Sequence, residues 1–164
     1  MKKEYITIIS LAAILAVFAG LTVYLGTRPP AAGCKQSLEM SVEGKFTFSQ
    51  ECIDKISDAA KEATLKTGAS EQVANRASEA AAEAARNTFE SGTSPTIIAQ
   101  GIANDTFNVI AEEAAAQGQN MTEATKVATA AGAAAAFAAL GATSPDAAEF
   151  AASVSNASSS KTRG

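Results

Sequence analysis

The stretch AAGAAAAFAALGATSP, from Ala130 to Pro145, decides the fold of this chain. It contains one aromatic residue, one leucine and no charged residue. Alanine has the highest helix propensity of all residues, and its small side chain lets helix backbones approach closely. A helix that is apolar on nearly every side is buried or contacts partners on several faces. We therefore predict a helix over about 121–140 that either lies at the centre of a domain or exposes a small-residue face to another protein.

Four short junctions divide the chain around this helix. Their sequences are TGAS, SGTSP, QGQN and LGATSP. In each, a glycine ends one helix in a left-handed conformation, and a Ser or Asn two or three residues later caps the next helix. The predicted N-caps are Ser70, Ser94, Asn120 and Ser144.

The segments between the junctions carry apolar residues at helical spacing, which predicts five helices. The first starts at Thr47 or Ser49, the second carries Phe89 on its apolar face, and the fifth is short. Short loops force neighbouring helices to run antiparallel. The fold class is therefore all-α. We predict an Ala-rich bundle or small stack of about five antiparallel helices over 47–154, preceded by a transmembrane helix.

Two glycines lie inside predicted helices, where each costs about 1 kcal/mol relative to alanine unless close packing compensates. We expect Gly101 and Gly132 to lie at close contacts between helices. After Val154 the chain becomes polar and rich in serine. We predict that residues 155–164 form a disordered tail.

The N-terminal region 1–27 is predicted to be a membrane anchor. The residues from Ile6 to Leu25 carry no charge. About 20 helical residues are enough to cross the hydrocarbon core of a bilayer. A cleaved signal peptide is the alternative, but its apolar region would be unusually long.

The flanks and faces of the predicted span add two expectations. Lys2 and Lys3 precede the span, which slightly favours a cytosolic N-terminus. Ala12, Ala16 and Gly20 fall four residues apart on one face. Small residues at this spacing let two membrane helices approach closely, so the span could self-associate.

A linker, residues 28–46, joins the predicted span to the helical domain. Two prolines at its start cannot continue a helix. The residues KFTF, 45–48, alternate and could pair briefly as a strand. Cys34 lies in this linker and Cys52 at the start of the first helix of the domain. In an oxidising compartment the two would form a disulfide, whereas in the cytosol they would stay reduced, and the side of the membrane is open.

The composition argues against several kinds of chemistry. The chain has no histidine, which removes the commonest general base and metal ligand. Its net charge is −4, and it has no basic cluster beyond the two N-terminal lysines. Glu112 and Glu113 are adjacent and so point to different sides of a helix. We predict no enzymatic activity, no catalytic residue, no cofactor, no metal site and no nucleic-acid partner.

Three sequons for N-glycosylation occur, at Asn104, Asn120 and Asn156. Modification requires an exposed site on the lumenal side of a membrane. Asn120 has a predicted capping role, and Asn104 lies within a predicted helix. Asn156 is therefore the candidate for glycosylation.

The organisation of the chain resembles the Ala-rich, single-pass, membrane-anchored minor capsid proteins of large icosahedral DNA viruses. A basic N-terminus, one span, a Pro-containing linker and Ala-rich helices with Gly-Ser-Pro junctions carry this resemblance. It implies a tether between an internal virion membrane and the capsid, with the lipid bilayer and other proteins of the assembly as partners. The alternative is a bacterial or archaeal protein of the cell envelope whose helical head binds a peptide, lipid or protein.

Overall fold

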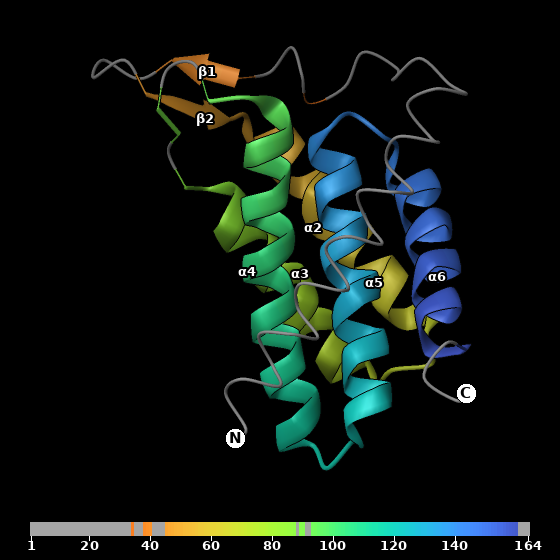
Figure 1. Ribbon diagram of the computed structural model, residues 1–164. Helices are drawn as coiled ribbons and strands as arrows, with labels where there is room; N and C mark the ends of the chain where they lie inside the picture. The colour runs from red at the N-terminus through yellow and green to blue at the C-terminus, as the bar shows by residue number, and fades with distance from the viewer. Residues whose placement is uncertain (1–33, 35–37, 41–44, 88, 91–92, 161–164) are drawn as a thin grey trace.

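The computed structural model describes residues 34, 38–40, 45–87, 89–90 and 93–160. Five helices and one two-stranded hairpin make up this part of the chain (Figure 1). Their bounds are β1 Leu38–Met40, β2 Phe46–Phe48, α2 Gln50–Lys66, α3 Glu71–Ala85, α4 Pro95–Ala116, α5 Met121–Ala139 and α6 Ser144–Ser160. The predicted all-α bundle of five helices is confirmed.

The predicted membrane span lies in a part of the chain that the structure does not describe. The segment from Ile6 to Leu25, including Ala12, Ala16 and Gly20, lies outside the described residues. Within the described ranges, no helix is both long enough and apolar enough to cross a bilayer.

Polar caps start the helices where the junction sequences place them. Each capping side chain accepts a hydrogen bond from the backbone N–H three residues further on. Ser49 caps α2, Ser70 caps α3, Ser94 caps α4 and Asn120 caps α5. The glycines that end α2, α4 and α5 have positive φ angles, as a left-handed helix end requires: Gly68 at 86°, Gly118 at 79° and Gly141 at 103°.

The predicted cap of the last helix is wrong by one residue. The Oγ1 atom of Thr143 accepts the hydrogen bond from Asp146 N at 3.3 Å, so Thr143 is the cap. Ser144 is the first residue of α6, and its Oγ atom donates to the carbonyl oxygen of Lys55 on α2 at 3.0 Å. The junction holds two hydroxyl residues in a row. Contact with α2, which is distant in sequence, determines which of them caps the helix.

Helix α5 lies at the centre of the bundle, which resolves the alternative left open by its composition. Every residue from Val127 to Ala139 is buried. Helices α2, α4 and α6 all pack against it (Figure 1). Because its side chains are small on every side, three helices can surround it closely.

The backbones of α4 and α5 approach each other closely at Gly132. A Cβ atom added to Gly132 would lie 2.6 Å from the carbonyl oxygen of Ala103, a distance that Cβ atoms essentially never show. The expectation of close packing is therefore confirmed for Gly132. It is wrong for Gly101, where an added Cβ would meet nothing within 4 Å. Gly101 lies on a partly exposed face of α4, which leaves space for a side chain.

Two predicted helix ends are wrong. Helix α3 ends at Ala85, and Phe89 lies outside it in an isolated β-bridge with Phe46. Helix α6 continues to Ser160, so the predicted boundary at 154 is wrong and most of the predicted tail is helical. Ser155 is fully buried, and its hydroxyl donates to the carbonyl oxygen of Ala152 at 2.9 Å. A serine satisfied within its own helix need not end that helix.

Candidate functional site

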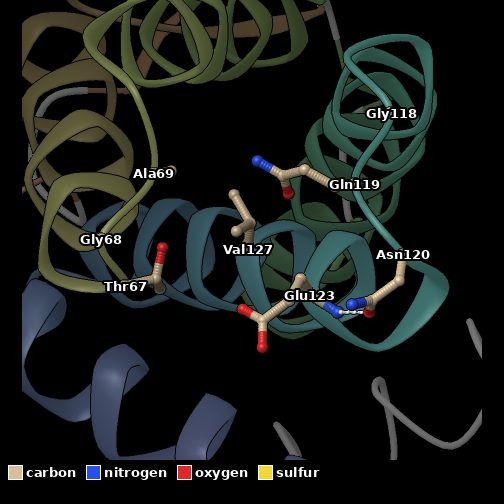
Figure 2. A pocket seen from close by; sticks show the side chains of 8 residues that line it. All are labelled: Thr67, Gly68, Ala69, Gly118, Gln119, Asn120, Glu123 and Val127. Carbon is tan, nitrogen blue, oxygen red and sulfur yellow. Dashed lines mark hydrogen bonds between the residues drawn. The ribbon is translucent and has the colours of Figure 1, made fainter.

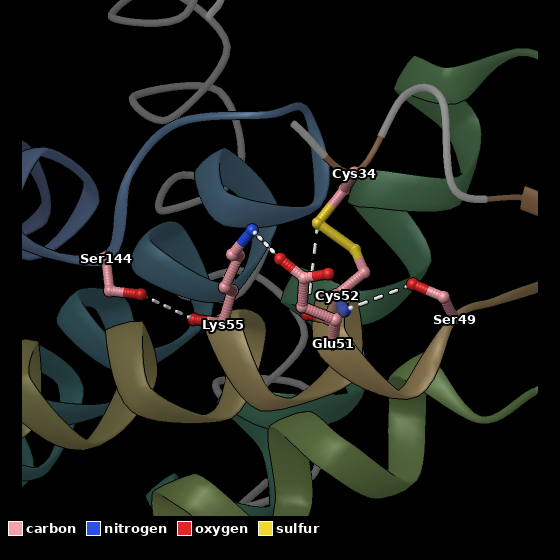
Figure 3. Close-up of a disulfide and its surroundings, with 6 residues drawn as sticks. All are labelled: Cys34, Ser49, Glu51, Cys52, Lys55 and Ser144. Carbon is pink, nitrogen blue, oxygen red and sulfur yellow. Dashed lines mark hydrogen bonds and ion pairs between the residues drawn. A yellow bond between two sulfur atoms is a disulfide. The ribbon is translucent and has the colours of Figure 1, made fainter. Parts of the chain in front are cut away.

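The clearest feature outside the helical core is the attachment of the linker to the bundle. A disulfide joins Cys34 to Cys52 in the first turn of α2, with their Cα atoms 5.2 Å apart (Figure 3). Both residues are 2% exposed. The bond therefore holds the linker directly against the hydrophobic core.

Hydrogen bonds support this junction on the α2 side. Ser49 Oγ accepts from the N–H of Cys52 at 3.3 Å and so caps the helix at the bonded residue. One turn further, Lys55 Nζ lies 2.7 Å from Glu51 Oε1. This hydrogen-bonded ammonium lowers the pKa of the Glu51 carboxyl, which is exposed to solvent. Figure 3 also shows Ser144 reaching the Lys55 carbonyl, so α6 begins against the same turn of α2.

The β-hairpin holds the linker a second time. Strand β1 pairs antiparallel with β2, and Phe46 in β2 exchanges two backbone hydrogen bonds with Phe89, each 2.8 Å long. The ring of Phe48 packs edge-on against that of Phe89, with centroids 5.9 Å apart. Phe89 therefore closes the hairpin onto the segment between α3 and α4. We refer to this end of the bundle, with the disulfide, the hairpin and the start of α4, as the disulfide end.

At the opposite end, which we call the turn end, two interhelical turns line a shallow pocket of about 330 Å³ (Figure 2). The turn between α2 and α3 contributes Thr67, Gly68 and Ala69, and the turn between α4 and α5 contributes Gly118, Gln119 and Asn120. Gln119 and Val127 point into the space between the turns. The Oε1 atom of Gln119 is buried there and has no hydrogen-bond partner among the described residues.

In the described part of the chain, no three acidic or sulfur-bearing side chains lie close enough together to hold a metal ion. The turn pocket has one carboxylate, Glu123, and it lies at the N-terminus of α5, where an acid complements the helix dipole. The arrangement of the described residues at the two ends is suited to attachment and contact.

No protein-family model, no curated protein and no solved structure matches this chain. Function must therefore be argued from the geometry of the described residues and from the sequence.

The structure places the sequence-predicted residues in different parts of the molecule. Cys34 and Cys52 come together at the disulfide end. Asn120 borders the turn pocket at the far end, where Ser70 also reaches the α4–α5 turn through Gln117, at 3.4 Å. Asn156 is exposed on α6, and its glycosylation stays a prediction.

Sequence reasoning missed two residues at these locations. The sequence predicts Phe89 in a helix, and the Asn and Thr residues before it are only a weak local signal that does not mark where α3 ends. No sequence pattern marks Gln119, because its position in the pocket depends on how the α2–α3 helix pair packs against the α4–α5 helix pair.

Proposed function

We propose that this chain is a non-enzymatic, membrane-anchored tether whose helical head docks into a larger protein assembly. The observation that carries the proposal is the disulfide between Cys34 and Cys52, which attaches the linker to the head. Eight residues, 26–33, separate Cys34 from Leu25, the last residue of the predicted membrane span. A tether needs such a short, covalently fastened connection between its anchor and its head.

The disulfide also gives the tether a direction across the membrane. Disulfides persist in oxidising compartments and are rare in the cytosol. The head would therefore lie on the non-cytosolic side, with the N-terminus in the cytosol. Lys2 and Lys3, which precede the uncharged stretch, favour the same orientation.

The nature of the head supports a structural role. Its centre is an alanine-rich helix whose residues from Val127 to Ala139 are all buried. A rigid body of this kind can transmit a positional constraint from a membrane to a protein shell. The assembly that we propose is a virion, in which this chain is a minor capsid protein that links an internal membrane to the capsid.

The membrane topology is the first test. The full chain would be expressed with its N-terminal segment, and the membranes would be washed with alkaline carbonate. We expect the chain to stay in the membrane, and a maleimide–polyethylene glycol reagent to label the cysteines only after denaturation and reduction. Release by carbonate, or labelling without reduction, would contradict the anchor or the oxidised head, respectively.

The partner is the second test. Cross-linking mass spectrometry on native particles or membranes would use the lysines of the head, such as Lys61 and Lys126. Stoichiometric links to one shell protein would support the capsid tether. The alternative is an envelope-anchored binding module, which the pocket at the turn end favours. Links from the turn end to a varied set of envelope proteins would support that alternative and count against the capsid tether.

A further inference from the structure

Three large apolar side chains stand out from the surface of the described residues. Leu65 is 40% exposed, Ile97 is 60% exposed and Met121 is 58% exposed. Leu65 lies in the last turn of α2 and Met121 is the first residue of α5, so both belong to the turn end. Ile97 lies in the first turn of α4, at the disulfide end (Figure 1).

The chain around Ile97 carries no charge over an unusual length. No ionisable side chain occurs from 91 to 104, which includes the first half of α4. Pro95 and Thr96, beside Ile97, are also exposed. Elsewhere on the head, acidic side chains outnumber basic ones. The start of α4 can therefore enter a poorly hydrated environment without the cost of removing water from a charge, whereas the exposed Glu51–Lys55 pair at the same end has to stay among water or headgroups.

The length of the spacer limits which end of the head can reach a membrane. Nine steps along the chain from Leu25 to Cys34 extend at most about 30 Å. The headgroup region takes up roughly 5 Å of that reach. Helix α4, with its 22 residues, runs about 33 Å from the disulfide end to the turn end. With the helices upright on the membrane, the turn end could face the bilayer only if Cys34 stood farther from it than the spacer allows.

We propose that the disulfide end is the face of the head that contacts the lipid surface, with Ile97 lying among the headgroups. This inference rests on the membrane anchor proposed above. At Ile97 the contact is apolar, because the acidic head would be repelled by anionic lipids and a zwitterionic surface is the partner that fits the uncharged start of α4. It leaves the turn end pointing away from the membrane, free for a protein partner.

Tryptophan fluorescence tests this orientation, because the chain contains no native tryptophan. Ile97→Trp places a reporter at the disulfide end, and Met121→Trp places a matched reporter of nearly equal exposure at the turn end. The full chain would be reconstituted into phosphatidylcholine vesicles, with and without bromine atoms near the start of the acyl chains. Circular dichroism would show that both variants fold.

We expect bromolipid to weaken the emission of Ile97→Trp at least about twofold, since apolar side chains at an interface lie roughly 5–10 Å deep. The emission of Met121→Trp should not change, and high salt should leave both results unaltered. Equal quenching of both reporters, or none at position 97 in a chain that resists carbonate, would overturn the orientation and leave the anchor intact. Loss of the chain from carbonate-washed vesicles would instead overturn the anchor itself.

Discussion

At the residue scale, two glycines on neighbouring helices have opposite roles. Gly132 allows α5 to pass within contact distance of the Ala103 carbonyl on α4, whereas Gly101 faces open space. Both lie inside helices and share the same loss of helix propensity relative to alanine. Their difference is therefore a difference of packing alone, and the two form a matched pair.

We expect Gly132→Ala to lower the free energy of unfolding by about 1–3 kcal/mol, because the added methyl group would clash with backbone that cannot move aside cheaply. Gly101→Ala should raise it by up to about 1 kcal/mol, as the gain in helix propensity meets no clash. Urea unfolding of the full chain in detergent, followed by circular dichroism, measures both. A Gly132→Ala variant as stable as Gly101→Ala would show that α4 and α5 do not pack this closely.

The exposed pair at the start of α2 allows a residue-scale test of electrostatics. Lys55 lowers the pKa of Glu51, so Lys55→Met should raise that pKa towards its ordinary value. The pair stabilises the folded chain above the pKa of Glu51 in the unfolded chain, and this contribution is lost as the pH falls through its lower folded value. An NMR titration of the Glu51 side chain gives the pKa directly. Lys61→Met, a change further along the same helix, should leave it unaltered.

At the element scale, helix starts were more predictable than helix ends. Ser70 and Asn120 satisfy N–H groups three residues away, which is a local interaction that the sequence displays. The end of α3 at Ala85 depends on Phe89 pairing with Phe46, a residue more than 40 positions earlier. The cap of α6 likewise depends on contact with Lys55. Contacts between distant segments decide these positions, and a single sequence does not display them.

The C-terminal end of α6 is the helix end that lies farthest from its predicted position, at Ser160 instead of Val154. A chain truncated after Val154 would lose the buried Ser155 and the last turns of the helix. We expect this truncation to lower the free energy of unfolding by about 1–2 kcal/mol and to reduce helical circular dichroism. A chain ending at Ser160 is the control and should match the full chain. If both truncations leave stability unchanged, the segment after Val154 behaves as the tail that its composition suggested.

At the scale of the whole molecule, the helical bundle was accessible from the sequence, whereas the candidate site was accessible only in part. The alanine content and the four junction sequences predicted five antiparallel helices, because helix propensity and helix capping depend on residues close together in the sequence. The sequence left two states open for Cys34 and Cys52, since their pairing depends on the fold and on the compartment. No sequence pattern predicted the pocket between the two turns, because it arises where the α2–α3 helix pair packs against the α4–α5 helix pair.

The disulfide provides a prediction for the molecule as a whole. It closes a loop with a sequence separation of 18 residues, and a loop of this size constrains the unfolded chain by about 3 kcal/mol. Reduction should therefore lower the midpoint of thermal unfolding. A chain with both Cys34→Ala and Cys52→Ala should start near the reduced midpoint and show no further change with reductant. An equal midpoint for the oxidised and reduced chains would contradict a stabilising role for the bond.

The alanine interior of α5 also affects the entropy of folding. Burying a leucine or methionine removes rotamer freedom that the unfolded chain possessed, whereas alanine has no rotamers to lose. From Val127 to Ala139, the helix can be buried on all sides while losing side-chain entropy at only three positions, Val127, Thr129 and Phe137. Folding of this helix is then opposed mainly by the loss of backbone entropy. Alanine has the highest helix propensity of all residues, so the net cost of forming the helix is low. A larger side chain there would bury more apolar surface, but it would also lose rotamer entropy on folding.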